Sequence, residues 1–241
     1  MNITILNGTQ RHGSTNTLIH QVIAKLDPKL NPVITEFFLP QAMPHFCLGC
    51  TTCILNDRQR CPHAASVEPI REALLTADLI IIGSPVYVFE VSGQLKALLD
   101  HFGYAWMSHR PESAMFGKLG LSVVTGAGAG MKSATQTIQT NLQWWGVGQR
   151  FQLRHGVMAA SYAAIPQNIK RQLDYTSTRL AKRLSQAALR PVKAAWSARM
   201  LCEIMRISKK DHPEWNAVDH AYWQAQGFFD GVKPWNTVKE A

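Results

Sequence analysis

Short apolar segments alternate with amphipathic segments through the first 160 residues of the chain. Five of the apolar segments are rich in β-branched residues and are predicted to be strands, at 2–7, 33–39, 77–84, 118–125 and 151–159. Between them, apolar residues recur three or four positions apart, as at Leu95, Leu98 and Phe102, which is typical of a helix that packs one face on a sheet. This alternation predicts an α/β fold with a doubly wound parallel sheet.

The segment ADLIIIGS, at 77–84, is apolar at consecutive positions, which is typical of a central strand that is buried on both faces. In a sheet of this kind, ligands bind beyond the carboxyl ends of the strands, at the point where the strand order reverses. We therefore expect a binding site in the loops that follow the first, third and fourth predicted strands.

The C-terminal part of the chain differs from the rest in pattern and in charge. The strand pattern stops after residue 160, and three helices are predicted, at 166–188, 192–206 and 213–227. We divide the chain into a domain at 1–160 and a helical extension at 161–241 that packs on the domain or at a subunit interface. Most of the net charge of +9 lies near the C-terminus, since residues 151–241 hold 14 Lys and Arg against 7 Asp and Glu. No RNP-type aromatic motif or Cys/His finger accompanies this charge, so we expect no nucleic-acid partner.

Composition indicates a globular protein. The 241 residues are 46% hydrophobic and 17% charged, which is enough apolar surface for a full core. The N-terminal MNITILNGTQ has no basic segment followed by an apolar core, and the longest uncharged run, 37–56, contains two prolines. We therefore expect a cytoplasmic protein with reduced thiols and no membrane contact.

The loop after the first strand, NGTQRHGSTNTL at 7–18, carries groups that bind phosphate. It precedes a predicted helix and combines one guanidinium, one amide and several hydroxyls, on Thr9, Arg11, Ser14, Thr15, Asn16 and Thr17. Backbone N–H groups at a helix N-terminus, hydroxyl donors and a guanidinium are what a phosphate requires. The loop matches neither GxxxxGK[ST] nor GxGxxG, which argues against a nucleoside triphosphate or a dinucleotide. A helix cap with polar decoration is the alternative.

Two further loops suit a flat ring. In GSPVYVFEVSGQLKALLDH, at 83–101, Pro85 stiffens the turn, and the segment 86–89 offers backbone polar groups beside apolar side chains. In TGAGAG, at 125–130, glycines at alternate positions allow the backbone to approach a ring or a phosphate closely. Taken singly, each could also be an ordinary loop or turn.

Together these loops resemble those of the NAD(P)H-dependent FMN reductase family of the flavodoxin-like superfamily, and in particular its iron-sulfur flavoprotein branch. GTQRHGSTNTL is similar to the family's G-S-x-R-x-x-(G)-S/N loop, and GSPVYVFEVSGQLKALLDH resembles its S-P-x-Y-x-x-x-x-x-G-x-L-K-x-x-x-D signature. The resemblance covers residues 1–160 and departs from the family pattern at Gln10, Phe89 and Glu90.

The resemblance implies a flavodoxin-like five-stranded sheet in the order 2-1-3-4-5, bound FMN, and NAD(P)H as co-substrate. It implies that the FMN phosphate is held by Thr9, Arg11, Ser14, Asn16 and Thr17. One edge of the isoalloxazine would then be bordered by Pro85, Val86, Tyr87 and Val88, and the other by Thr125, Gly126 and Gly128.

Four of the five cysteines lie in the segment CLGCTTCILNDRQRC, at 47–61. The spacing C-x2-C-x2-C-x7-C suits the corners of a [4Fe-4S] cluster better than it suits zinc, which usually draws on two separated C-x2-C pairs. Free thiols or a redox disulfide remain open as well. In iron-sulfur flavoproteins this motif carries the cluster, so the resemblance implies a metal site at Cys47, Cys50, Cys53 and Cys61. Cys202, alone in a helical stretch, is predicted to be a small buried hydrophobe.

The leading hypothesis is an FMN-dependent oxidoreductase that passes hydride from NAD(P)H to the flavin and on to a small-molecule acceptor such as a quinone or a free flavin. No protein acid or base is assigned, because the chemistry is the cofactor's. The alternatives are an electron-transfer protein with FMN, a [4Fe-4S] cluster and a ferredoxin-like partner, and an interaction module without FMN. His101, His109 and Arg110 could meet a nicotinamide phosphate or cap a helix. We expect a homodimer or homotetramer.

Overall fold

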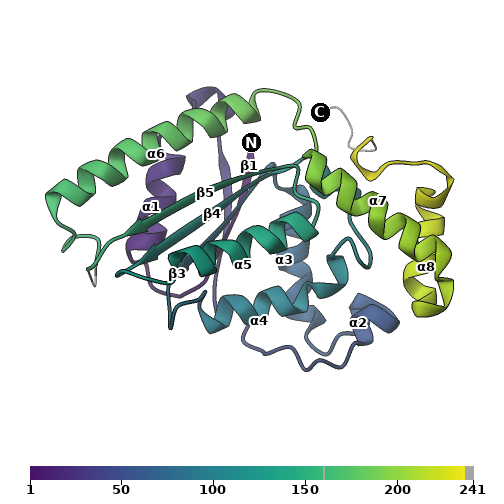
Figure 1. The fold of residues 1–241 in the computed structure, drawn as a ribbon. Helices are drawn as coiled ribbons and strands as arrows, with labels where there is room; N and C mark the ends of the chain where they lie inside the picture. The colour runs from purple at the N-terminus through teal and green to yellow at the C-terminus, as the bar shows by residue number, and fades with distance from the viewer. Residues whose placement is uncertain (160, 237–241) are drawn as a thin grey trace.

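The computed structural model describes residues 1–159 and 161–236 (Figure 1). Its centre is one parallel sheet in the order β2-β1-β3-β4-β5. The strands are β1 (Asn2–Asn7), β2 (Val33–Phe38), β3 (Leu79–Pro85), β4 (Leu119–Gly126) and β5 (Gln149–Gly156). The predicted flavodoxin-like fold and strand order are therefore confirmed. The fifth predicted strand extends too far, because the backbone leaves β5 at Gly156.

Helices cover both faces of the sheet (Figure 1). On one face lie α1 (Ser14–Ile23) and α6 (Gln167–Ala188). On the other lie α3 (Ala64–Thr76), α4 (Gly93–His101) and α5 (Met131–Trp144). The central strand β3 contributes side chains to the cores on both faces, since Ile81 points to the first face and Ile80 and Ile82 point to the second. All three side chains are fully buried, which explains why this strand is apolar at consecutive positions.

The C-terminal helices α7 (Trp196–Asp211) and α8 (Ala217–Ala225) build a third, smaller core with Met107 and Phe116. The predicted helix at 213–227 is divided, because the Asn216 side chain accepts from the backbone N–H groups of Val218 and Asp219 and so begins α8 there. The short helix α2 (Thr52–Leu55), in the cysteine-rich loop, packs against α8 (Figure 1). The C-terminal extension therefore contacts the helix that contains Cys53.

Short 3₁₀ turns lie at Pro28–Leu30, Arg58–Arg60, Gly103–Ala105, Ser113–Gly117, Pro213–Trp215, Phe228–Asp230 and Pro234–Asn236. Among residues 1–159 and 161–236, no helix combines the length and the apolar character needed to cross a lipid bilayer.

Candidate functional site

A cleft of about 180 Å³ opens at the carboxyl ends of β1, β3, β4 and β5. It lies beside the β1/β3 switch point, where the strand order reverses and α/β sheets bind their ligands. Four loops line it, through Thr9, Arg11, Gly13, Ser14, Thr15, Pro85, Val86, Tyr87, Thr125, Gly126, Ala127, Val157, Met158 and Ala159. The parallel sheet brings these loops to one edge although they are far apart in sequence.

One end of the cleft is built to receive an anion. Helix α1 begins here with Gly13 as its N-cap, and no side chain of the described chain caps its first N–H groups. Its first turn contains no acidic residue, while the guanidinium-bearing Arg11 lies in the same wall. The Arg11 backbone N–H donates to Thr9 Oγ1 at 3.2 Å, which shapes the loop. Uncapped helix N–H groups beside a guanidinium favour a phosphate or a carboxylate.

The floor of the cleft joins two loops through one hydrogen bond. Thr15 Oγ1 and Thr125 Oγ1 lie 2.6 Å apart, and both side chains are buried. This contact ties the start of α1 to the end of β4. The relative position of the two walls is therefore fixed by a buried polar contact, which is the kind of support that holds a preformed site.

The other end of the cleft is bordered by a strained, exposed turn. Tyr87 and Glu90 exchange two backbone hydrogen bonds, of 2.9 and 3.1 Å. The turn residues between them, Val88 and Phe89, have φ of 47° and 65°, in the left-handed region that β-branched and bulky residues rarely adopt. Both side chains are exposed, and Met158, which also has a left-handed backbone, lines the same cleft. Strain of this kind persists where the surrounding structure enforces it, and it concentrates at binding sites.

The four cysteines of the segment 47–61 lie outside this cleft, around α2. All five cysteines of the chain are free thiols; Cys47 and Cys50 are exposed, and Cys202 is buried as predicted. Burial and, after it, the charges of Cys61, Cys47 and Cys50 raise the pKa of Cys53. Hydrogen bonds from the side chain and backbone of Thr52 lower the pKa of Cys50.

Arg110 holds this cysteine-rich loop, and the C-terminal extension supports Arg110 from behind. The Arg110 guanidinium donates to the carbonyl oxygens of Cys53, of Ile54 at 3.2 Å and of Asn56 at 3.2 Å. Behind it, the fully buried Asp219 of α8 lies 3.4 Å from Arg110 Nε and accepts hydrogen bonds from His109 Nδ1 at 2.7 Å and Lys209 Nζ at 3.0 Å. His109 and Arg110 therefore serve this ionic network and lie away from the cleft.

Residues 1–164 match the family model described as NADPH-dependent FMN reductase. The chain belongs to this family. It is accordingly an FMN-dependent NAD(P)H oxidoreductase, and the family resemblance of its loops is confirmed.

Two curated relatives extend the comparison. An iron-sulfur flavoprotein of Methanocaldococcus jannaschii is 30% identical over 140 residues, which are 57% of this chain and 69% of that protein. An FMN-dependent NADH:quinone oxidoreductase of Burkholderia lata is 31% identical over 152 residues, which are 56% of this chain and 76% of that protein. Among solved structures, an apo NADH:FMN oxidoreductase aligns with a TM-score of 0.56 at 20% identity, covering 81% of this chain and 95% of that one. This last likeness shows the shared fold.

The cleft of this FMN reductase family member has the donors that FMN requires. An uncapped helix N-terminus, hydroxyls and Arg11 fit the phosphate, and the glycine-lined and apolar walls fit a flat ring. Eight of the residues implied by the resemblance line the cleft: Thr9, Arg11, Ser14, Pro85, Val86, Tyr87, Thr125 and Gly126.

Four other implied residues are placed elsewhere. The Asn16 side chain is buried under the loop and donates to Asn7 Oδ1 at 3.3 Å and to Glu36 Oε1 at 2.8 Å. Thr17 Oγ1 donates to the Gly13 carbonyl oxygen at 3.1 Å. The Val88 side chain is 93% exposed in the turn, outside the cleft lining. Gly128 lines a neighbouring hollow together with Lys132, Arg154 and His155.

The sequence reasoning missed the wall that follows β5. Val157, Met158 and Ala159 line the cleft, although they were assigned to a strand. The signal was available, because the carboxyl end of a fifth parallel strand must reach the same edge as the other four. Gly13 and Ala127 were missed as well, and they lie between residues that were identified. Thr15, which the first loop offered as a phosphate-binding hydroxyl but the resemblance did not include, also lines the cleft.

Proposed function

We propose that this chain oxidises NAD(P)H and reduces a small-molecule acceptor of the quinone or flavin class, with FMN held in the cleft at the β1/β3 switch point. The observation that carries the proposal is the pairing, in one cleft, of an uncapped helix N-terminus beside Arg11 with an exposed apolar turn. FMN supplies hydride-transfer chemistry when it is bound. The residues of the chain bind and orient it.

The cleft lining supports a site in which the protein binds and orients FMN and the cofactor supplies the chemistry. Among the described residues that line it, none is a carboxylate or a histidine, so the walls offer hydroxyls, backbone groups and one guanidinium. These groups bind an anion and a polar ring edge, and they do not supply a general acid or base near neutral pH. The exposed Val88 and Phe89 form an apolar rim on which a flat, uncharged acceptor could rest.

The four clustered thiols favour a second candidate function. An electron-transfer protein would hold FMN in the same cleft and a [4Fe-4S] cluster on Cys47, Cys50, Cys53 and Cys61, and would exchange electrons with a ferredoxin-like partner. The donor set fits such a cluster, because all four thiols are free and come from one loop, and the other three raise the pKa of Cys53. The basic C-terminal part of the chain would suit an acidic partner.

Anaerobic stopped-flow mixing with NADPH and with NADH tests the proposal. We expect the FMN absorbance of the purified protein to bleach with at least one nucleotide and to recover when a quinone is added. Absence of bleaching with both nucleotides would overturn the reductase function. Iron and acid-labile sulfide are assayed on the same preparation, since about four irons per chain would support the electron-transfer candidate.

A further inference from the structure

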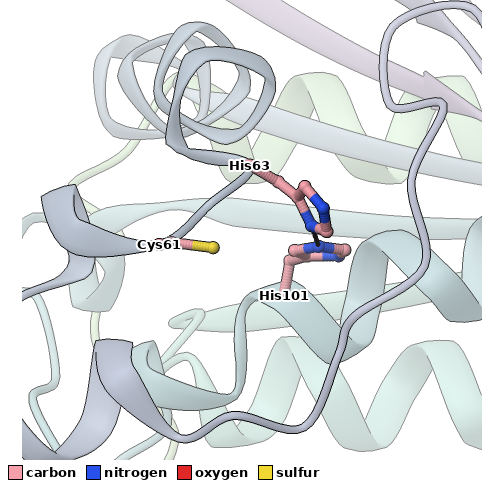
Figure 2. A group of neighbouring side chains, drawn as sticks. All are labelled: Cys61, His63 and His101. Carbon is pink, nitrogen blue, oxygen red and sulfur yellow. Dashed lines mark hydrogen bonds between the residues drawn. The ribbon is translucent and has the colours of Figure 1, made fainter.

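Three metal-ligating side chains from two parts of the chain, Cys61 and His63 at the end of the cysteine-rich loop and His101 on α4, meet at one place (Figure 2). Cys61 follows the 3₁₀ turn Arg58–Arg60, His63 immediately precedes α3, and His101 is the last residue of α4. Each offers one ligand atom, and these atoms all lie within 4.8 Å of one another. In the close-up, the Cys61 sulfur points toward the two imidazoles.

The hydrogen bonds of the histidines determine which nitrogen of each faces the site. His101 Nδ1 lies 2.7 Å from the Ala97 carbonyl oxygen, which can only accept, so Nδ1 carries the proton. In this neutral imidazole, His101 Nε2 carries the lone pair, and it accepts a hydrogen bond from His63 Nδ1 at 3.0 Å (Figure 2). His63 Nδ1 and His101 Nε2 therefore share one proton between them. A metal ion would take the position of that proton and be bound by the lone pairs of both nitrogens.

The surroundings hold both rings in this orientation. His101 is 4% exposed, and its bond to the Ala97 carbonyl is the support that metal-bound histidines usually have through their second nitrogen. His63 caps no N–H group of α3, so its ring is available. The His45 ring stacks on His63 at 4.5 Å between centroids and 11° between planes, which covers one face of His63 and leaves its nitrogens directed along the edge.

The spacing also agrees with coordination. Two nitrogens bound to one zinc ion at about 2.0–2.1 Å lie roughly 3.3 Å apart at a tetrahedral angle. The observed 3.0 Å separation is close to this value, so a small adjustment would admit an ion. One thiolate and two imidazoles form a borderline-soft donor set, which suits Zn²⁺ better than Mg²⁺ or Ca²⁺.

We propose that Cys61, His63 and His101 bind one Zn²⁺ ion, with the fourth coordination position left to water. On binding, the proton of the Cys61 thiol is released to solvent, and the imidazole proton of His63 moves from Nδ1 to Nε2, so that one thiolate and two neutral imidazoles face the ion. This site is distinct from a four-cysteine cluster, because it does not use Cys47, Cys50 or Cys53. The two share Cys61, so they exclude one another on the same chain.

Titration of the full-length, reduced and metal-free chain with Co²⁺ tests the site, because Co²⁺ in a zinc site shows a thiolate-to-cobalt charge-transfer band and intense ligand-field bands. We expect one Co²⁺ per chain, displaced by Zn²⁺. Cys61→Ser should abolish the charge-transfer band. His63→Gln and His101→Gln should retain the band and weaken Co²⁺ binding at least roughly tenfold, since loss of even a supporting partner of a metal ligand costs that much.

Two control variants separate this site from the cysteine motif. Cys47→Ser and His155→Gln should bind Co²⁺ with the affinity and spectrum of the wild type. The proposal is wrong if Cys47→Ser removes the band as Cys61→Ser does, or if both histidine variants bind Co²⁺ as the wild type does. Circular dichroism verifies folding, and if buried His101 tolerates no substitution, the partly exposed His63 decides the outcome.

Discussion

At the scale of single residues, Arg11 is the one charged side chain among the described residues that line the cleft. If it contacts the FMN phosphate, Arg11→Ala removes a charge-assisted hydrogen bond worth roughly 1.5–3 kcal/mol. We expect the Kd for FMN to rise by about tenfold to a hundredfold, measured by fluorescence titration of the apoprotein. The exposed Arg171→Ala on α6 should leave the Kd unchanged. An unaltered Kd in Arg11→Ala would remove Arg11 from the phosphate site.

The thiols should differ in reactivity, because the thiolate is the nucleophile and the cysteines differ in pKa. Hydrogen bonds with Thr52 lower the pKa of Cys50, whereas burial raises the pKa of Cys53, and burial raises that of Cys202 to about 12. In the reduced, metal-free chain we expect iodoacetamide to modify Cys50 before Cys53, and Cys202 only on unfolding.

Peptide mass spectrometry at successive times measures this order. Thr52→Val keeps the shape of the side chain but removes its hydroxyl, and should slow alkylation of Cys50. If Cys53 reacts first in the wild type, the hydrogen bonds with Thr52 do not govern reactivity in this loop.

Lys118 makes stability depend on pH. The residue is 6% exposed, its ammonium donates to the carbonyl oxygens of Leu75 and Ala77 at 2.7 and 2.5 Å, and burial lowers its pKa to about 8. Between about pH 8 and 10.4 the unfolded chain holds a proton that the folded chain has released, so the free energy of unfolding rises with pH in this window.

Comparison with Lys118→Met isolates this contribution. Relative to the variant, the wild type should gain up to about 3 kcal/mol across the window, measured by urea unfolding at several pH values. The exposed Lys132→Met serves as control and should parallel the wild type. Parallel curves for Lys118→Met as well would contradict the assignment.

At the scale of elements, the turn between Tyr87 and Glu90 is held from outside. A Cβ on Gly130 would lie 2.6 Å from Phe89 Cα, so only glycine allows the start of α5 to pack this closely. Glu90 Oε2 also accepts from Ser133 Oγ at 2.6 Å. These contacts from α5 keep Val88 and Phe89 in left-handed backbone conformations that neither residue favours.

Relief of this strain should stabilise the protein. Val88→Asn places a residue that tolerates the left-handed region at φ 47°, and the 93% exposed valine gives up little packing. We expect the free energy of unfolding to rise by about 1 kcal/mol, read from thermal or urea unfolding. The matched change Val33→Asn, at an exposed valine in the extended strand β2, should not raise the free energy of unfolding. Equal effects at the two positions would mean that Val88 is not strained.

At the scale of the whole molecule, the C-terminal extension supports the cysteine-rich loop through Asp219. This buried carboxylate faces three cationic or ionisable side chains, and one of them, Arg110, holds the backbone of the loop. Asp219→Asn would leave these groups without a counter-charge, which typically costs 3–5 kcal/mol. We expect that loss of stability together with faster alkylation of Cys53.

The exposed Asp230→Asn is the matched control and should change stability by no more than about 0.5 kcal/mol. If Asp219→Asn lowers stability while the alkylation rate of Cys53 in the folded chain is unchanged, the extension does not organise the loop.

The fold and much of the cleft could be predicted because their signals are local. The period of apolar residues distinguishes strands from helices, and the four consecutive apolar residues 79–82 indicate that β3 is buried on both faces. Loops that leave parallel strands must meet at one edge, so Thr9, Pro85 and Thr125 could be placed together before the structure was known. Asn16 could not be placed, because its choice between a ligand and Glu36 depends on β2, a different segment of the chain.

The sequence by itself determined the class of fold, the order of its elements and the loops that form the cleft, because backbone periodicity and parallel pairing leave few arrangements. Only the tertiary structure decided which distant side chains meet. His63 reaches His101 because α3 and α4 pack on the same face of the sheet, and Asp219 reaches Arg110 because α8 folds back on the cysteine-rich loop. Contacts of this kind depend on packing between elements, and no local pattern of residues records them.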